Sequence, residues 1–114
     1  MPIKTASAKA KGRRLQQATR DAFLNAYPDL EPDDLVSCPM GSRGDDLVMS
    51  PKAKRMINMA IECKARANGF TNVYDALSQA DRQDGRTPIV VLKQDRCEPI
   101  VALSLADFLK LVTK

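Results

Sequence analysis

Two short apolar segments that each carry acidic residues constrain the fold of this chain more than any other feature. They are residues 45–49, which read DDLVM, and residues 60–64, which read AIECK. Each segment is too short for a stable helix, so we predict two neighbouring strands that hold carboxylates at one edge of a sheet. Side chains alternate along a strand, so Glu62 and Lys64 are expected on one side and Cys63 on the other.

The acids in these two segments have the chemistry of a magnesium site. Burying ionisable groups beside a core is costly unless they are paired or coordinate a metal. Mg²⁺ takes one or two carboxylates and keeps several waters for substrate phosphate, so Asp46 and Glu62 could hold one ion between them. Lys64 would lie next to the metal-bound water and orient or activate it, which predicts hydrolysis of phosphodiester bonds. By parity Asp45 and Asp46 face opposite sides, and the pattern alone leaves open which of them is the ligand.

The motif resembles that of the PD-(D/E)XK nuclease superfamily, with Asp46 as its first acid and residues 62–64 as its E-X-K tripeptide. Residues 11–13, 40–46 and 50–51 also match the sequence pattern of such nucleases, so that the resemblance covers about residues 8–108. It is to small phage-encoded nucleases related to archaeal-type Holliday junction resolvases, which act in DNA recombination.

The resemblance implies Mg²⁺, with Mn²⁺ as a possible substitute, and DNA, branched DNA in particular, as the substrate of a homodimer. Alignment with the family motif favours Asp46 over Asp45 as the metal ligand. Asp45 then occupies the position of the proline in the PD-(D/E)XK motif. The implied metal ligands are Asp46, Glu62 and Cys63, and Lys64 is the implied catalytic lysine.

Two glutamines are further candidates for the catalytic site. Archaeal-type resolvases place a glutamate on their first helix, and the nearest match in this chain is Gln16, which brings no charge. Nucleases of this superfamily often place a helical glutamine near the active site, which makes Gln79 a candidate accessory residue. An exposed helical glutamine is the alternative explanation of Gln79.

The basic residues are concentrated at the N-terminus. Residues 1–20 carry six Lys and Arg residues and no acid, while the whole chain has a net charge of +4. Such an arm suits phosphate contacts, and the alternative is a solvated tail. Arg13, Arg14 and Arg20 are expected largely outside the apolar stripe of the first predicted helix. A glycine- and serine-containing loop and a second basic cluster after Ser50 add further candidates. The candidate DNA-binding residues are Lys9, Lys11, Arg13, Arg14, Ser42, Arg43, Lys52, Lys54, Arg55 and Arg66.

Composition excludes several other classes of site. The chain has no histidine, which excludes His-dependent nuclease sites, Ser-His and Cys-His nucleophiles, and zinc sites that need imidazole. Its three cysteines are odd in number and form no C-x-x-C pair, so we expect reduced thiols in the core. It has no apolar run of roughly 18 residues and no signal-peptide pattern, so we expect a soluble, cytoplasmic protein with no membrane partner.

The pattern of elements predicts an α/β fold. We expect a disordered basic tail over residues 1–6 and a single nuclease domain over residues 7–114. Helices are predicted from Ser7 to Tyr27, from about Thr71, as the N-cap, to about Gln83, and after Ser104, with a basic link after Ser50. Strands are predicted at residues 35–38, 46–49, 60–64, 89–93 and 99–103, and the last two are expected to form a hairpin. This order corresponds to a mixed five-stranded β-sheet flanked by helices, the restriction-endonuclease-like core.

The sequence therefore predicts a Mg²⁺-dependent DNA endonuclease that is selective for branched DNA. Two alternatives remain open. One is a nuclease that cuts flaps or single-stranded DNA with the same site. The other is a non-catalytic basic DNA-binding protein whose nuclease site has decayed, which the neutral Gln16 would suit.

Overall fold

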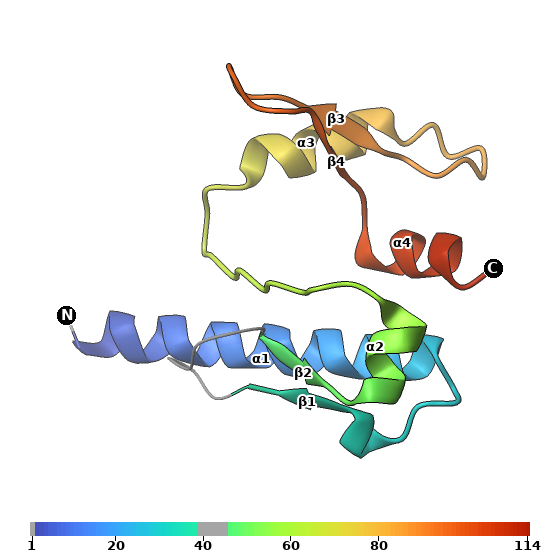
Figure 1. Cartoon of the computed structure of the whole chain (residues 1–114). Coiled ribbons are helices and arrows are strands. Elements are labelled where there is room, and N and C mark those ends of the chain that lie inside the picture. The colour runs from blue at the N-terminus through green and yellow to red at the C-terminus, as the bar shows by residue number, and fades with distance from the viewer. Residues whose placement is uncertain (1, 39–45) are drawn as a thin grey trace. The chain divides into compact units, whose positions relative to one another are not determined.

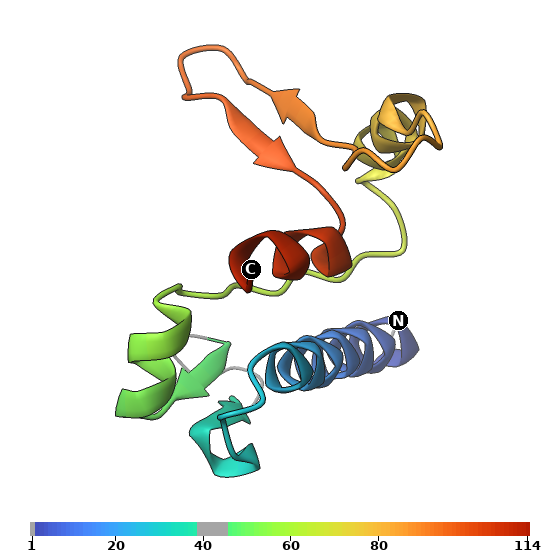
Figure 2. The ribbon, with the colours of Figure 1, turned by 90° about the vertical axis from the view of Figure 1, so that its right-hand side faces the viewer.

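The computed structural model describes residues 2–38 and 46–114 of the chain. By their contacts the residues divide into two compact units, Met1–Arg66 and Ala67–Lys114, which we call the first and the second unit. Helices and strands occur in both units, which confirms the α/β class (Figures 1 and 2). The single domain expected over residues 7–114 stays a prediction.

The long helix α1, Pro2–Ala26, is the main element of the first unit (Figure 1). Its buried residues Gln16, Thr19 and Phe23 follow the three- and four-residue spacing of one helix face. The helix begins at Pro2, where we expected a disordered tail and a start at Ser7. Proline is tolerated in the first turn of a helix, and the alanines and lysines that follow it favour helix.

A small antiparallel sheet packs beside α1. Strands β1, Leu35–Ser37, and β2, Leu47–Met49, pair with Leu35 opposite Met49. Leu35 and Leu47 are fully buried, whereas Val36 is exposed, so the side chains alternate as strands require. Both predicted strands are confirmed, although each is shorter than expected. A single 3₁₀ turn, η1, covers Pro32–Asp34 and leads into β1.

The segment after Ser50 forms helix α2, Pro51–Ile57, and the prediction of a basic link was wrong there. The Ser50 hydroxyl accepts a hydrogen bond from the amide of Ala53, which makes Ser50 the N-cap. Pro51 follows at the first helical position, and Asn58 ends the helix in the left-handed conformation. These start and stop signals were present in the sequence, but the apolar face of only two buried residues, Ala53 and Ile57, gave little periodicity.

Asp34 joins η1 to the start of α2. Its carboxylate accepts hydrogen bonds from the Glu31 amide at 2.8 Å and from the Ser50 hydroxyl at 2.7 Å. The Glu31 amide, and after it the Ser50 hydroxyl, hold the pKa of Asp34 below its usual value. Protonation of Asp34 therefore opposes folding of the first unit.

The free energy of unfolding should consequently depend on the charge of Asp34 in acid. Because its pKa is lower in the folded state, the stabilisation is present above about pH 4, the ordinary range of an aspartate, and is lost as the pH falls through the folded pKa. We expect Asp34→Asn to lower stability at neutral pH and to flatten the acid limb of the stability curve. Urea unfolding between about pH 2 and pH 7 measures both effects. The exposed neighbour Asp33 supplies the control, and equal curves for Asp34→Asn and Asp33→Asn would contradict the prediction.

The predicted five-stranded sheet is wrong for the part of the chain that the structure describes. Residues 60–64 are extended but join no sheet there, and each sheet has two strands. A ladder strand needs its main-chain amides for neighbouring strands, whereas the amide of Cys63 donates to the side chain of Asp46. The carboxylate thus takes the place of a ladder partner at this position.

The second unit contains α3, Thr71–Ala80, the hairpin of β3, Val90–Leu92, with β4, Ile100–Ala102, and α4, Leu105–Val112 (Figure 1). The hairpin is antiparallel, as predicted. The Ser104 hydroxyl accepts from the Asp107 amide at 3.1 Å, which confirms the predicted start of the last helix.

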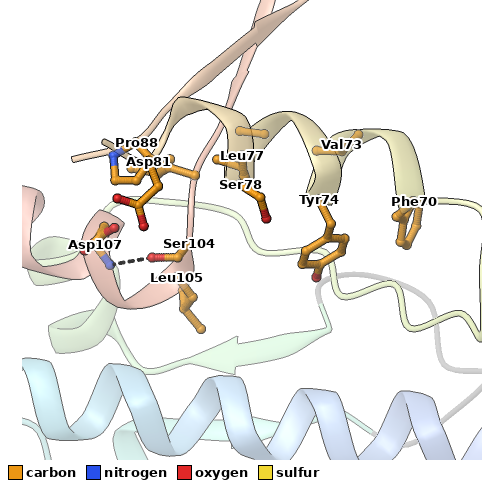
Figure 3. Close-up of a pocket in the computed structure, with 12 residues that line it drawn as sticks. Phe70, Val73, Tyr74, Leu77, Ser78, Asp81, Pro88, Ser104, Leu105 and Asp107 are labelled. Atoms are coloured by element: carbon orange, nitrogen blue, oxygen red, sulfur yellow. Dashed lines mark hydrogen bonds between the residues drawn. The ribbon is translucent and has the colours of Figure 1, made fainter. Parts of the chain in front are cut away.

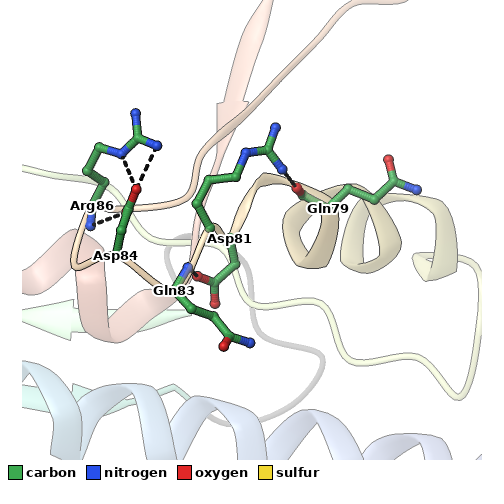
Figure 4. Close-up of polar contacts among 6 residues, drawn as sticks. Gln79, Asp81, Gln83, Asp84 and Arg86 are labelled. Carbon is green, nitrogen blue, oxygen red and sulfur yellow. Dashed lines mark hydrogen bonds and ion pairs between the residues drawn. The ribbon is translucent and has the colours of Figure 1, made fainter.

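Helix α3 ends at Ala80, before the expected Gln83, because local turns compete with it. Asp81 accepts from the amide of Gln83 at 2.9 Å, and Asp84 binds both the amide and the guanidinium of Arg86 (Figure 4). Such side-chain turns offer the backbone an alternative to the helix. At its other end the helix begins after Phe70, which takes the N-cap position that we expected for Thr71.

The described residues include no helix that is both long enough and apolar enough to cross a membrane. All three cysteines are free thiols, but Cys97 is exposed and Cys38 and Cys63 are half-buried, so the expected core position is wrong for Cys97.

Candidate active site

A hydrogen bond joins the two halves of the predicted site. The main-chain amide of Cys63 donates to Oδ2 of Asp46 at 2.5 Å, across 17 residues of sequence. The carbonyl of Asp46 in turn accepts from the amide of Cys38 at 2.9 Å, next to the paired strands β1 and β2. The first acid and the E-X-K tripeptide are therefore adjacent in the first unit.

Glu62 and Lys64 lie at the surface on either side of Cys63. Their side chains are 64% and 71% exposed and form an ion pair with 3.2 Å between Nζ and Oε2. Cys63 is half-buried, so the side chains alternate as predicted, even though the segment is not in a sheet. An exposed ion pair contributes only about 0–1 kcal/mol, so both groups can exchange partners when an anion or a cation approaches.

The thiol of Cys63 contacts helix α1. It donates to Oγ1 of Thr19, with 3.7 Å between sulfur and oxygen. Burial raises the pKa of the Cys63 thiol; the Thr19 contact opposes this, and the nearby carboxylates of Asp46 and Glu62 add to it. A thiol held in its neutral form is a poor ligand for a hard cation, so the predicted ligand Cys63 could serve only through its main-chain carbonyl.

The carboxylates of Asp46 and Glu62 are the side chains of the candidate site that could hold a Mg²⁺ ion. Asp46 and Glu62 are both close enough to Cys63 to affect the pKa of its thiol. The described residues contain no cluster of three or more His, Cys, Asp or Glu side chains suited to a metal. Mg²⁺ needs one or two carboxylates and keeps its waters, whereas structural zinc requires four ligands. Asp45, the other candidate acid, lies outside the described residues.

Gln16, the neutral residue at the possible position of an acid, is buried in the core of the first unit. It is 5% exposed, and its Oε1 accepts from the Ser37 hydroxyl at 2.8 Å. This bond ties α1 to β1, which suits a structural role, and the predicted catalytic role stays untested.

Gln79 is exposed on α3 of the second unit, and its carbonyl accepts from the Arg82 side chain (Figure 4). Its predicted accessory role likewise stays a prediction.

The basic residues of α1 differ in what they can offer to DNA. Lys9, Arg13 and Arg14 are exposed, and Lys11 is half-buried. Arg20, which we expected on the outer side of the helix, instead binds the first unit. Its Nε donates to the carbonyl of Leu35 at 2.6 Å, and its Nη2 donates to that of Pro32 at 2.9 Å.

The second basic cluster lies on α2, where Lys52, Lys54 and Arg55 are exposed. Lys52 donates to the carbonyl of Asp29 at 2.5 Å, so Lys54 and Arg55, in the last turn of the helix, are the stronger candidates for DNA contacts. Arg66 is exposed at the end of the first unit. The predicted DNA-binding residues Ser42 and Arg43 lie outside the described residues.

A cavity of about 640 Å³ occupies the second unit between α3 and the start of α4 (Figure 3). Its lining is mostly apolar and includes Val73, Leu77 and Leu105, with Asp81 and Asp107 at its polar end. None of the predicted catalytic residues lines it.

Sequence reasoning missed Thr19, which is 6% exposed and contacts Cys63. The available signal was its position, because polar residues at 16 and 19 share the face of α1 that also carries Phe23.

Comparison with protein-family models, with curated proteins and with solved structures gave no match. The assignment of function therefore depends on the residues and their geometry.

Proposed function

We propose that this chain is a Mg²⁺-dependent DNA endonuclease of the PD-(D/E)XK type. The observation that supports this most directly is the hydrogen bond from the Cys63 amide to the Asp46 carboxylate. It brings together an acid beside a strand and an E-X-K tripeptide from a separate segment, as a site of this type requires. The exposure of Glu62 and Lys64 leaves room for a phosphate to reach them.

In this proposal Asp46 and Glu62 would hold the ion. A carboxylate has about four acceptor positions, so one bond to the Cys63 amide leaves Asp46 with capacity for a ligand. Mg²⁺, when bound, supplies neutralisation of phosphate charge and a more acidic water. Lys64, released from its ion pair with Glu62, can place its ammonium against the attacking water or a phosphate oxygen.

The substrate class and the assembly follow from the resemblance to resolvases. We propose branched DNA as the substrate and a homodimer as the active form, because symmetric cutting of two strands at a junction needs two sites. Flap or single-strand cleavage by the same residues is the closest alternative. The other is a DNA-binding protein without catalysis, and the buried Gln16 favours it, since an amide bonded to Ser37 replaces a possible acid.

Metal-dependent cleavage of a matched panel of DNA substrates tests these possibilities. Four-way junctions, flaps, single strands and linear duplexes of the same sequences should be compared with Mg²⁺, with Mn²⁺ and with chelator. We expect symmetric, Mg²⁺-dependent cuts near the junction centre. Preferred cutting of flaps or single strands would support the other nuclease. Tight binding with no cleavage under either metal would sink the enzymatic proposal and favour the non-catalytic one.

The basic arm should control the salt dependence of DNA binding. If Lys9, Lys11, Arg13 and Arg14 each neutralise one phosphate, replacing all four with glutamine flattens the plot of log affinity against log salt by roughly 0.9 per contact, or about 3 to 4 in slope. Cleavage at low salt with saturating enzyme should be largely preserved, because none of the four replaced residues is a proposed catalytic or positioning residue.

The control for this variant removes the same charge from the second unit. Lys93, Arg96, Lys110 and Lys114 can be replaced by glutamine, and circular dichroism should first show that both variants are folded. An unchanged slope in the arm variant, or the same change in both, would mean that the arm makes no specific phosphate contacts. Lys54 and Arg55 on α2 would then be the next residues to test.

A further inference from the structure

Two buried polar residues of α1 accept side-chain hydrogen bonds within the first unit, Gln16 from strand β1 and Thr19 from the E-X-K tripeptide. Gln16 and Thr19 are three residues apart and so lie on one face of the helix. Gln16 accepts from Ser37 on β1, and Thr19 accepts from the thiol of Cys63. Apolar side chains are the ordinary occupants of such buried helix positions, so a hydroxyl at position 19 calls for a physical reason.

These contacts belong to a ring of hydrogen bonds through the first unit. From Ser37 the chain continues to Cys38, whose amide donates to the carbonyl of Asp46. The carboxylate of Asp46 accepts from the amide of Cys63, and the thiol of Cys63 returns to Thr19 on α1. Residues 60–64 pair with no strand among the described residues. Their attachment near Cys63 therefore depends on side-chain contacts such as these.

We propose that Thr19 is a positioning residue for the nuclease site and acts through Cys63. Its hydroxyl anchors the middle side chain of the E-X-K tripeptide, which keeps the Cys63 amide against Asp46 and leaves Glu62 and Lys64 facing outward. This inference rests on the proposed nuclease function. Its expected effect is on rate, because a displacement of catalytic groups by about 1 Å can cost on the order of 100-fold.

Thr19→Val tests the inference, since it removes the hydroxyl and keeps the shape of the side chain. We expect the cleavage rate at saturating enzyme to fall about tenfold while the Kd for DNA is unchanged, and Thr19→Ser to restore most of the rate. A core role alone would not lower the rate in this way, because valine suits a buried helix face. Unchanged cleavage by Thr19→Val, or equal losses with valine and serine, would overturn the proposal.

Cys63→Ala provides a second variant that does not alter α1. It should lower the rate to a similar extent, and the double variant with Thr19→Val should be no slower than either single one, because both remove the same contact. Fully additive losses would overturn the proposal. Should Thr19→Val fail to fold, a wild-type cleavage rate in Cys63→Ala would overturn it as well.

Amide hydrogen exchange gives a readout that does not need catalysis. The Cys63 amide, which donates to Asp46, should exchange about tenfold faster in Thr19→Val than in wild type or in Thr19→Ser. Exchange that does not change would overturn the anchoring role. If wild type cleaves no substrate, the nuclease proposal fails, and the exchange result alone decides whether Thr19 anchors this segment.

Discussion

Asp46→Ala is expected to abolish metal-dependent cleavage, with a loss of about 10³-fold or more in rate. Asp46 is the acid that the structure places against the E-X-K tripeptide, through the amide of Cys63. Removing its charge should leave DNA binding intact or slightly tighter, because a carboxylate repels phosphate. Single-turnover cleavage of the preferred substrate and a separate binding titration measure the two effects. Glu62→Ala should behave in the same way.

Two further variants show whether the loss of cleavage comes from removing the charge of Asp46 and whether Asp46 is the correct acid. Asp46→Asn keeps an oxygen that can accept from the Cys63 amide but removes the charge, so its cleavage should fall nearly as far as in Asp46→Ala. Asp45→Ala is the matched control one residue away. An inactive Asp45→Ala beside a nearly unaffected Asp46→Ala would identify Asp45 as the acid and show that the family register was misapplied.

The local elements of this fold could largely be predicted because their signals are local. Ser104 marks the start of α4 through an N-cap bond to the next turn, and the apolar runs around residues 90–92 and 100–102 form the predicted hairpin. Helix α2 was missed because its seven residues bury only Ala53 and Ile57, too few for a recognisable period. Its caps, Ser50 and Asn58, were the informative residues.

The sheet could not be predicted in the same way. Strand pairing is a long-range choice, and the alternation of residues 60–64 is equally satisfied by an extended segment held by side chains. That segment has the predicted exposure pattern, with Glu62 and Lys64 outward, but the Cys63 amide is taken by Asp46. The sequence therefore predicted correctly the two faces of the segment and its proximity to Asp46, and predicted incorrectly that the two segments pair as strands of one sheet.

For the candidate site, the sequence predicted which residues to test and that their two segments lie together. Acids and a lysine at short spacing made Asp46, Glu62 and Lys64 candidates, and the structure brings Asp46 to the segment that carries the other two. Arg20 shows the limit of charge arithmetic, since its guanidinium binds the carbonyls of Pro32 and Leu35. A count of basic residues cannot separate such a structural arginine from one that is available to DNA.

Lys64→Ala is expected to lose about 10²-fold in the cleavage step with little loss of DNA affinity. Lys64 is 71% exposed and pairs with Glu62 at 3.2 Å, so its ammonium is held beside one of the proposed metal ligands. In the proposed mechanism this ammonium would act on the reacting phosphate or its water, whereas affinity is expected to come mainly from the basic arm. Single-turnover rates at saturating enzyme, compared with the Kd, separate the two contributions.

Lys54→Ala is the matched control, because it removes the same charge from an exposed lysine of the first unit that lies outside the E-X-K tripeptide. It should weaken binding slightly and leave the rate at saturation unchanged. Lys64→Arg adds a second distinction, since guanidinium keeps the charge but differs from ammonium in shape and hydration. A chemical role predicts poor rescue by arginine, while a role in attracting DNA predicts full rescue. Equal losses of affinity and of saturated rate in Lys64→Ala would assign the residue to DNA docking and leave the carboxylates as the only proposed catalytic groups.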